Sequence, residues 1–320
     1  MKDNCVYNAL LNEIRKKIPQ NSKLVNKLVD ILYIEKEAVY RRLRREVPFT
    51  FQEIVILSKQ LGISLDYIME IDSHKKRSFQ LKLIEYMNPC EIDYSMIQDY
   101  VNIIQNSKNK TATETGVVSN ILPQTLYSGF KLISKFYIFK WHYHYDYNRI
   151  KPFHEMIVPE RISNLFTDNY IESKNIFDTS YILDSLIIQN LVNDIKYFNS
   201  IRLIKKDDVV LIKEELIRFV DYLEAIATDG YFKETKNKVQ IYISNINIDT
   251  NYTYLNTPNY KLSMIWTFIL TSTISMDIKT FNIIKNWFWS IIRNSTLITI
   301  TGEKERILFF ETQRKIIEEL

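Results

Sequence analysis

The first seventy residues carry apolar side chains at helical spacing, and breaks in this pattern divide them into short segments. The first stripe has a repeat of four, stops at Pro19 and indicates an amphipathic helix. It consists of Val6, Leu10, Ile14 and Ile18. A second helix is predicted over 22–32, after the start signal of Asn21 and Ser22. Helices this short depend on packing against partners, so the region predicts a compact all-α domain.

Two further helices are predicted beyond a basic segment in the middle of this region. Thr50 and Glu53 have the spacing of a capping box, which marks the start of one helix. Gly62 ends that helix, at a place where a left-handed residue is favoured. Ser64 caps one more turn, with the sequence LDYIME. Together with the basic segment, the region predicts five short helices.

The basic segment 35–46, EKEAVYRRLRRE, carries four arginines within five positions. Acidic residues at its start and arginines at its end suit the helix macrodipole, and Pro48 stops the helix. Ala38, Val39 and Leu43 can face inward. The positions that must point outward are Lys36, Glu37, Tyr40, Arg41, Arg44 and Arg45. A basic helix on a small rigid scaffold can lie in the major groove of DNA and reach base edges.

Residues 21–69 resemble the helix-turn-helix domain of lambda-repressor-like (Xre and BetR type) bacterial regulators. The motif AxYRRxRxE, followed by a helix that ends in LxxxxxISLD, carries the resemblance. It implies a positioning helix over 22–32 and a recognition helix over 35–46. The chain departs from the family in two places. The family often has glycine where this chain has Arg45, and its positioning helix commonly begins with a phosphate-binding glutamine, a place held here by Lys23 or a neighbour.

The outward-pointing residues of segment 35–46, together with Lys23, are assigned different contacts with DNA. Arg41 and Arg44 are the candidates for guanine, because a guanidinium can donate two hydrogen bonds to one guanine edge. Tyr40 and Glu37 are the candidates for neighbouring base edges. The candidates for phosphate contacts are Lys23, Lys36 and Arg45.

Two other interpretations stay open for the same helix. Its arginines could form a solvated face with ion pairs to Glu35, Glu37 and Glu46. Alternatively, the helical domain is a protein-interaction module, for example on phage or mobile-element machinery, that makes no DNA contact.

Composition limits the remaining function classes. The formal net charge is +4, from 42 basic and 38 acidic residues, so any attraction to nucleic acid must be local. Only 5 glycines leave little material for phosphate-binding loops. The two cysteines, Cys5 and Cys90, exclude a disulfide framework and a four-thiolate zinc site, and a reducing cytoplasm fits them best.

The pattern predicts a multidomain protein, mainly α with some β. The helix-turn-helix domain is expected over 1–72, a basic hinge over 73–80, and an α+β domain for sensing, dimerisation or both over 81–320. In the large domain, helices are expected over 79–87, 92–104, 181–199, 207–227 and the two last segments, 281–294 and 302–320. A polar loop is expected over 106–116, and strands of a small sheet over 238–247 and 259–274. Segment 130–147 fits either a buried helix or a pair of strands.

The large domain shows no motif for chemistry. His142, His144 and His154, with Glu155, could form a metal site only if they lay on one strand face, and we expect core or surface histidines instead. Nucleophile elbows, phosphate loops and zinc-protease motifs are absent from the sequence, so we expect neither an enzyme nor a cofactor. The tryptophans are expected mostly in the core, or along a ligand pocket. They are Trp141, Trp266, Trp287 and Trp289.

The longest apolar stretch, 262–276, is too short and too rich in serine and threonine to span a bilayer. A buried element is expected there, and no membrane partner. The expected partners are double-stranded DNA and a second copy of the chain, with a small-molecule or peptide effector as a further possibility.

Overall fold

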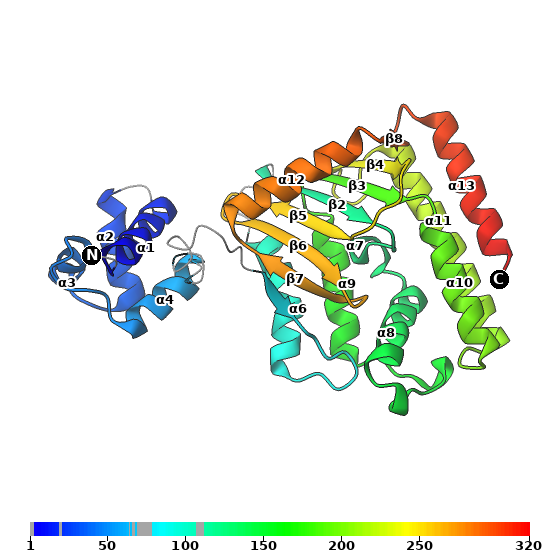
Figure 1. The fold of residues 1–320 in the computed structure, drawn as a ribbon, viewed down its shortest axis with the longest axis horizontal. Helices are drawn as coiled ribbons and strands as arrows, with labels where there is room; N and C mark the ends of the chain where they lie inside the picture. Colours follow the sequence, from blue (N-terminus) through cyan, green and yellow to red (C-terminus); the bar gives the residue numbers. More distant parts are fainter. Residues whose placement is uncertain (1–2, 19–20, 64, 66–67, 69–78, 107–111) are drawn as a thin grey trace. The chain divides into compact units, whose positions relative to one another are not determined.

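The chain forms two compact units, Met1–Ser78 and Phe79–Leu320 (Figure 1). The computed structural model describes residues 3–18, 21–63, 65, 68, 79–106 and 112–320. The expected hinge 73–80 lies outside the described residues as far as Ser78, and Gln80 already belongs to the first strand of the second unit.

Four helices make up the described part of the first unit, and their apolar stripes form its core. They are α1 (Asp3–Lys17), α2 (Asn21–Leu32), α3 (Lys36–Leu43) and α4 (Phe51–Leu61). The predicted stripe of α1 is buried at Leu10, Ile14 and Ile18, and Val39 and Leu57 are fully buried among the same residues. The helices predicted over 22–32 and from Thr50 are therefore confirmed. Most of the expected fifth turn after Ser64 lies outside the described residues.

The capping signals of α4 are present as the sequence predicts. Thr50 Oγ1 accepts a hydrogen bond from the backbone N–H of Glu53, and the Glu53 carboxylate accepts one from the backbone N–H of Thr50. Gly62 closes the helix with a left-handed backbone at φ 62°.

The basic helix is shorter than predicted, because α3 ends at Leu43 and residues 44–46 form a turn. Arg45 adopts a left-handed backbone with φ 68°. The N–H of Arg45 donates to Arg42 O (3.1 Å) and the N–H of Glu46 donates to Arg41 O (2.9 Å). This pair of hydrogen bonds is the Schellman termination of a helix, which normally uses glycine at the left-handed residue.

The second unit contains one eight-stranded sheet in the order β1-β7-β6-β5-β2-β3-β4-β8. The strands are β1 (Gln80–Lys82), β2 (Glu114–Ser119), β3 (Asp178–Asp184), β4 (Lys238–Ser244), β5 (Tyr252–Asn256), β6 (Lys261–Thr267), β7 (Thr271–Ser275) and β8 (Ser295–Leu297). β2, β3 and β4 run parallel, and the remaining neighbours pair antiparallel. The mixed α and β character expected for this unit is confirmed, and the sheet is larger than predicted.

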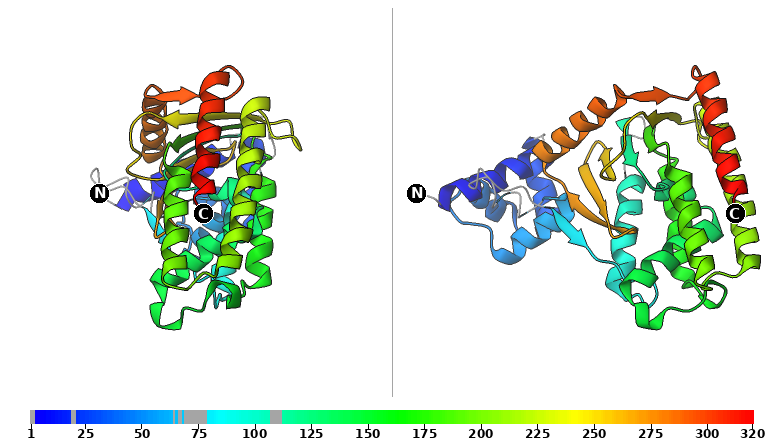
Figure 2. Two further views of the ribbon diagram at one scale, coloured as in Figure 1. Left: turned by 90° about the vertical axis from the view of Figure 1, so that its right-hand side faces the viewer. Right: turned by 45° about the vertical axis from the view of Figure 1, so that its right-hand side comes forward.

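Helices cover both faces of this sheet unequally (Figure 2). The helices are α6 (Glu91–Gln105), α7 (Gln124–Tyr127), α8 (Lys131–Tyr145), α9 (Glu160–Ser173), α10 (Ile187–Ser200), α11 (Lys206–Asp229), α12 (Ile278–Ile292) and α13 (Glu303–Glu318). Two short 3-10 turns, Tyr147–Arg149 and Phe153–Glu155, follow α8. Alternate residues of β2 and β3 divide between two cores: Val117 and Tyr181 join the helices α8 to α11, whereas Val118 and Ile182 join α12.

Several sequence assignments in this unit are wrong. The segment 79–87 contains the edge strand β1 and no helix, and β3 occupies the start of the helix predicted over 181–199. The loop predicted over 106–116 contains the start of β2, one of the two central strands of the sheet. The helix predicted over 207–227 is present as α11, although its apolar residues Val210 and Leu211 are about half exposed and lie outside the core.

Other assignments are confirmed. Segment 130–147 is helical as α8, with Phe136 and Phe139 buried, which decides against the pair of strands. The strand over 238–247 is β4, and the apolar stretch 262–276 forms β6 and β7. Among the described residues, none of the helices has both the length and the apolar character that crossing a bilayer requires.

Glycine at position 116 lets α12 approach the sheet. A Cβ atom there would overlap the ring of Tyr254 and lie 2.9 Å from Phe288 of α12. We expect Gly116→Ala to lower the free energy of unfolding by about 1–3 kcal/mol, because the overpacked ring cannot move away in a dense core. Urea unfolding of the full chain measures this. Ser180→Ala, at the paired position on β3, is the control because it adds no volume, and equal effects of the two substitutions would contradict the argument.

Candidate nucleic-acid interface

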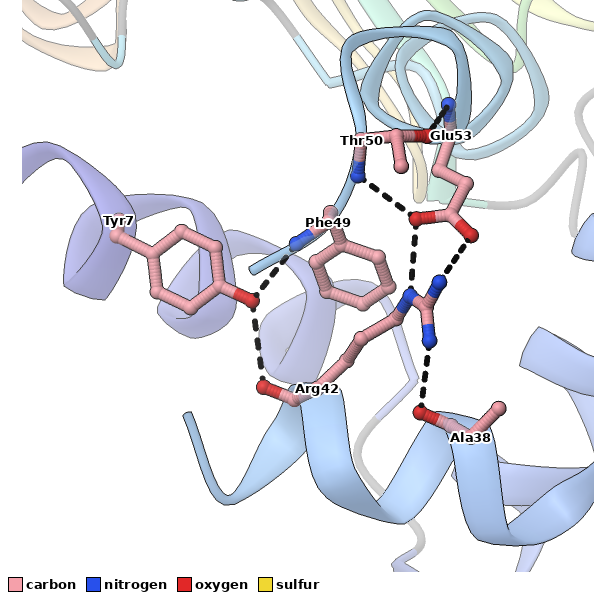
Figure 3. Close-up of polar contacts among 6 residues, drawn as sticks. All are labelled: Tyr7, Ala38, Arg42, Phe49, Thr50 and Glu53. Carbon is pink, nitrogen blue, oxygen red and sulfur yellow. Dashed lines mark hydrogen bonds and ion pairs between the residues drawn. The ribbon is translucent and has the colours of Figure 1, made fainter. Parts of the chain in front are cut away.

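Arg42 fastens the basic helix α3 to α4 from the inside (Figure 3). Its Nε donates to Glu53 Oε2 (2.9 Å) and its Nη2 to Glu53 Oε1 (2.6 Å). Both side chains are largely buried, with 14% and 12% of their surface exposed. Nη1 also donates to Ala38 O (3.1 Å), one turn back on α3. This two-point contact fixes the rotation of α3 as well as its position, because a guanidinium and a carboxylate pair in one plane.

Tyr7 of α1 holds the other side of the same junction. Its hydroxyl donates to Arg42 O (3.2 Å) and accepts a hydrogen bond from the backbone N–H of Phe49 (3.2 Å). The end of α3 is therefore attached to α1, to α4 and to the segment that leads into α4 (Figure 3). Burial raises the pKa of the Tyr7 hydroxyl, so it stays protonated and able to donate.

Glu53 is ionised in this network. Burial alone would raise its pKa, but hydrogen bonds from Arg42 and Thr50 outweigh that effect and hold the pKa below its ordinary value. The roles of Arg42 and Tyr7 were not predicted from the sequence. A signal for Arg42 was available, because position 42 lies one helical turn after Ala38 and so on the inward face.

The predicted DNA-binding side chains are all exposed. Lys36, Glu37, Tyr40 and Arg41 project from α3 itself, and 45% of the Tyr40 side chain is accessible. Arg44 and Arg45 are exposed in the turn after the helix, and Lys23 is exposed near the start of α2.

The connection between α2 and α3 is a three-residue turn, 33–35. Tyr33 has a left-handed backbone at φ 53° and is 91% exposed. Two packed helices joined by a turn of this length, commonly with glycine in it, are characteristic of helix-turn-helix units. Here a tyrosine occupies the left-handed position.

Acidic residues accompany the exposed arginines on this surface. Arg44 Nη2 lies 2.8 Å from Glu37 Oε1, and Arg44 Nε lies 3.4 Å from Glu46 Oε1. Arg41 Nε lies 3.7 Å from Glu46 Oε2. All four side chains are about half exposed or more, so each ion pair contributes only about 0–1 kcal/mol. The pairs leave the guanidinium groups accessible.

The expected histidine candidates for metal binding are not brought together. His142 is buried and His144 is exposed on α8, and His154 Nε2 lies 3.4 Å from Glu155 Oε1. Within the described ranges, no group of three His, Cys, Asp or Glu side chains could hold a metal ion.

Two of the four tryptophans do not lie in the core, where most of them were predicted. Trp141 is buried and stacks on Tyr145, and Trp266 is partly buried. Trp287 and Trp289 lie on the flanks of α12 with 62% and 48% of their surface exposed, so the expectation is wrong for these two.

Removing Arg42 should unfold the first unit more easily. We expect Arg42→Ala to cost about 3 kcal/mol, because it leaves the Glu53 carboxylate largely buried without its cation. Arg41→Ala, an exposed arginine on the same helix, should change stability by no more than about 0.5 kcal/mol. Circular dichroism during urea unfolding compares the two variants. Equal free energies of unfolding would show that the contact of Arg42 with Glu53 does not stabilise the first unit.

The stability of the first unit should depend on pH through Glu53. Its pKa in the folded chain is below the ordinary value of 4.5, so its contribution is present above about pH 4.5 and is lost as pH falls through the lower, folded pKa. Urea unfolding midpoints between pH 6 and pH 3 measure this loss. Glu53→Gln should remove part of the loss of stability at low pH. The same decrease of the unfolding midpoint with pH in Glu53→Gln as in the unmodified chain would contradict this role of Glu53.

Replacing Arg45 by glycine should stabilise the turn after α3. A side chain at φ 68° costs about 1 kcal/mol, which glycine avoids, although glycine gives back part of the gain through the entropy of the unfolded chain. Arg45→Ala is the control, because it removes the charge but keeps Cβ. Thermal unfolding should show a gain for glycine alone.

No family model, no curated protein and no solved structure matches this chain.

Proposed function

We propose that the chain is a sequence-specific DNA-binding transcription regulator that reads duplex DNA with α3 of its first unit. The observation that carries this proposal is the division of one short helix into two faces. Arg42 and Val39 fix the inner face, while Tyr40, Arg41 and the following Arg44 point outward. A rigidly held helix with exposed guanidinium groups meets the geometric requirement for reading the major groove.

Under this proposal the side chains take the roles that the sequence suggests. Arg41 and Arg44 contact guanine, and Tyr40 and Glu37 contact neighbouring base edges. Lys23, Lys36 and Arg45 contact phosphates and set the register of the protein on the duplex. The left-handed turn at Tyr33 and the resemblance in residues 21–69 support this assignment.

The second unit completes the proposal. We infer that it pairs two copies of the chain, senses a small molecule or peptide, or does both, which would set the spacing between two half-sites. The free, exposed thiol of Cys90 supports a reducing cytoplasm as the location.

Selection from a pool of random DNA duplexes tests the proposal with the full chain. We expect the protein to enrich a sequence motif, and Arg41→Ala with Arg44→Ala to lose that preference and at least tenfold in affinity, since each bidentate contact to guanine contributes about 1–3 kcal/mol. The matched control is Arg218→Ala with Arg293→Ala, which removes the same charge from exposed positions of the second unit.

Two salt concentrations separate base reading from general attraction. Loss of phosphate contacts would flatten the dependence on salt, whereas loss of base contacts would leave it nearly unchanged. Failure of the unmodified chain to enrich any sequence would reject the proposal. A protein captured through the face of α3 under the same conditions would instead favour an interaction module.

A further inference from the structure

Glu46 lies between the two arginines that we assign to guanine. One carboxylate oxygen is 3.7 Å from Arg41 Nε, and the other is 3.4 Å from Arg44 Nε. The position of Glu46 follows from the backbone, because its N–H donates to Arg41 O (2.9 Å) in the left-handed turn at Arg45. The helix ending therefore fixes the backbone of Glu46 beside both arginines, and its side-chain rotamer completes the two contacts.

Glu46 contacts Arg41 at Nε, on the edge of the guanidinium group nearest the backbone, which we call its inner edge. Guanidinium groups have five N–H donors, and bidentate recognition of guanine needs two neighbouring ones. Within the described residues the Arg41 side chain makes no hydrogen bond, and its contact with Glu46 is through Nε at 3.7 Å, so its outer edge is available. Arg44 is held more completely, by Glu37 (2.8 Å) and by the carbonyl of Tyr40 (3.4 Å) as well as by Glu46.

The charge balance of this surface points the same way. Four basic side chains, Lys36, Arg41, Arg44 and Arg45, stand among the three acids Glu35, Glu37 and Glu46, so the face has little net charge. Phosphates are attracted by net positive charge, which Glu46 lowers beside both guanidinium groups. A guanine edge carries no net charge, and it can be bound by the outer edge of Arg41 while the inner edge keeps its carboxylate.

We infer that Glu46 is a positioning residue for base recognition, which holds Arg41 ready for guanine and weakens contacts to phosphate. This inference rests on the proposed function and concerns the specificity of the same surface. With Glu46 in place, the affinity of the protein for DNA depends more on the base sequence than on the phosphate backbone.

The test compares Glu46→Gln with Glu35→Gln in the full chain. Both substitutions remove one negative charge beside α3, but Glu35 shows no ion pair among the described residues. Affinity is measured for the enriched duplex and for a duplex in which its G·C pairs are replaced. We expect Glu46→Gln to raise affinity for the replaced duplex about two- to fivefold, the size of exposed ion pairs, and to lower the ratio between the two duplexes by at least that factor. Glu35→Gln should change both affinities together and leave the ratio intact.

Glu46→Asp gives a second measurement that keeps the charge. It should retain more of the discrimination ratio than Glu46→Gln does, and circular dichroism confirms that each variant is folded. Parallel shifts for Glu46→Gln and Glu35→Gln would overturn the inference while leaving DNA binding in place. Absence of any enriched motif for the unmodified chain would instead overturn the proposed function.

Discussion

The bidentate contact between Arg42 and Glu53 is the interaction on which the arrangement of the first unit depends. It joins a helix of only eight residues to its neighbour through two parallel hydrogen bonds. A helix this short has little intrinsic stability, so its orientation must come from tertiary contacts. Glu53 serves two purposes, because the same carboxylate caps α4 and receives Arg42. The start of one helix and the rotation of another are thus determined by a single side chain.

The second unit obtains its rigidity differently, from the dense packing of two faces of one sheet. The parallel strands β2 to β4 are covered by α8 to α11 on one face, and α12 crosses the other. The close approach of α12 depends on Gly116, because the rings of Tyr254 and Phe288 occupy the space that a side chain at this position would need. Shape in this unit is therefore set by apolar packing, in contrast to the polar junction that sets the first.

Local patterns predicted the first unit well, because its helices are amphipathic and their ends carry recognisable caps. The Thr50 capping box and Gly62 each mark a helix boundary that is present in the structure. The ending of α3 was misjudged, since an arginine rarely takes a left-handed backbone, and only the glycine that the resembled family often has at this position pointed to one.

The sheet was harder to predict because its central strands are buried on both faces. In β3 the run of Tyr181, Ile182 and Leu183 is apolar throughout, and periodicity cannot distinguish such a strand from a buried helix. The start of β2 contains polar Glu114 and Thr115, and these look like loop residues until their partners on other strands are known. At the candidate site, exposure could be predicted residue by residue, whereas the separate role of Arg42 depends on a partner eleven positions away.

The length of α3 limits how much sequence information one copy could extract. Eight helical residues span about 12 Å, which matches roughly four base pairs at about 3.4 Å each. A four-base-pair word recurs about once in 256 positions of random DNA, and a genome offers about a million or more competing sites. Under the proposed function, one copy of the chain could not select a single binding site in a genome. Two copies bound to adjacent half-sites would recognise a sequence about twice as long and could do so.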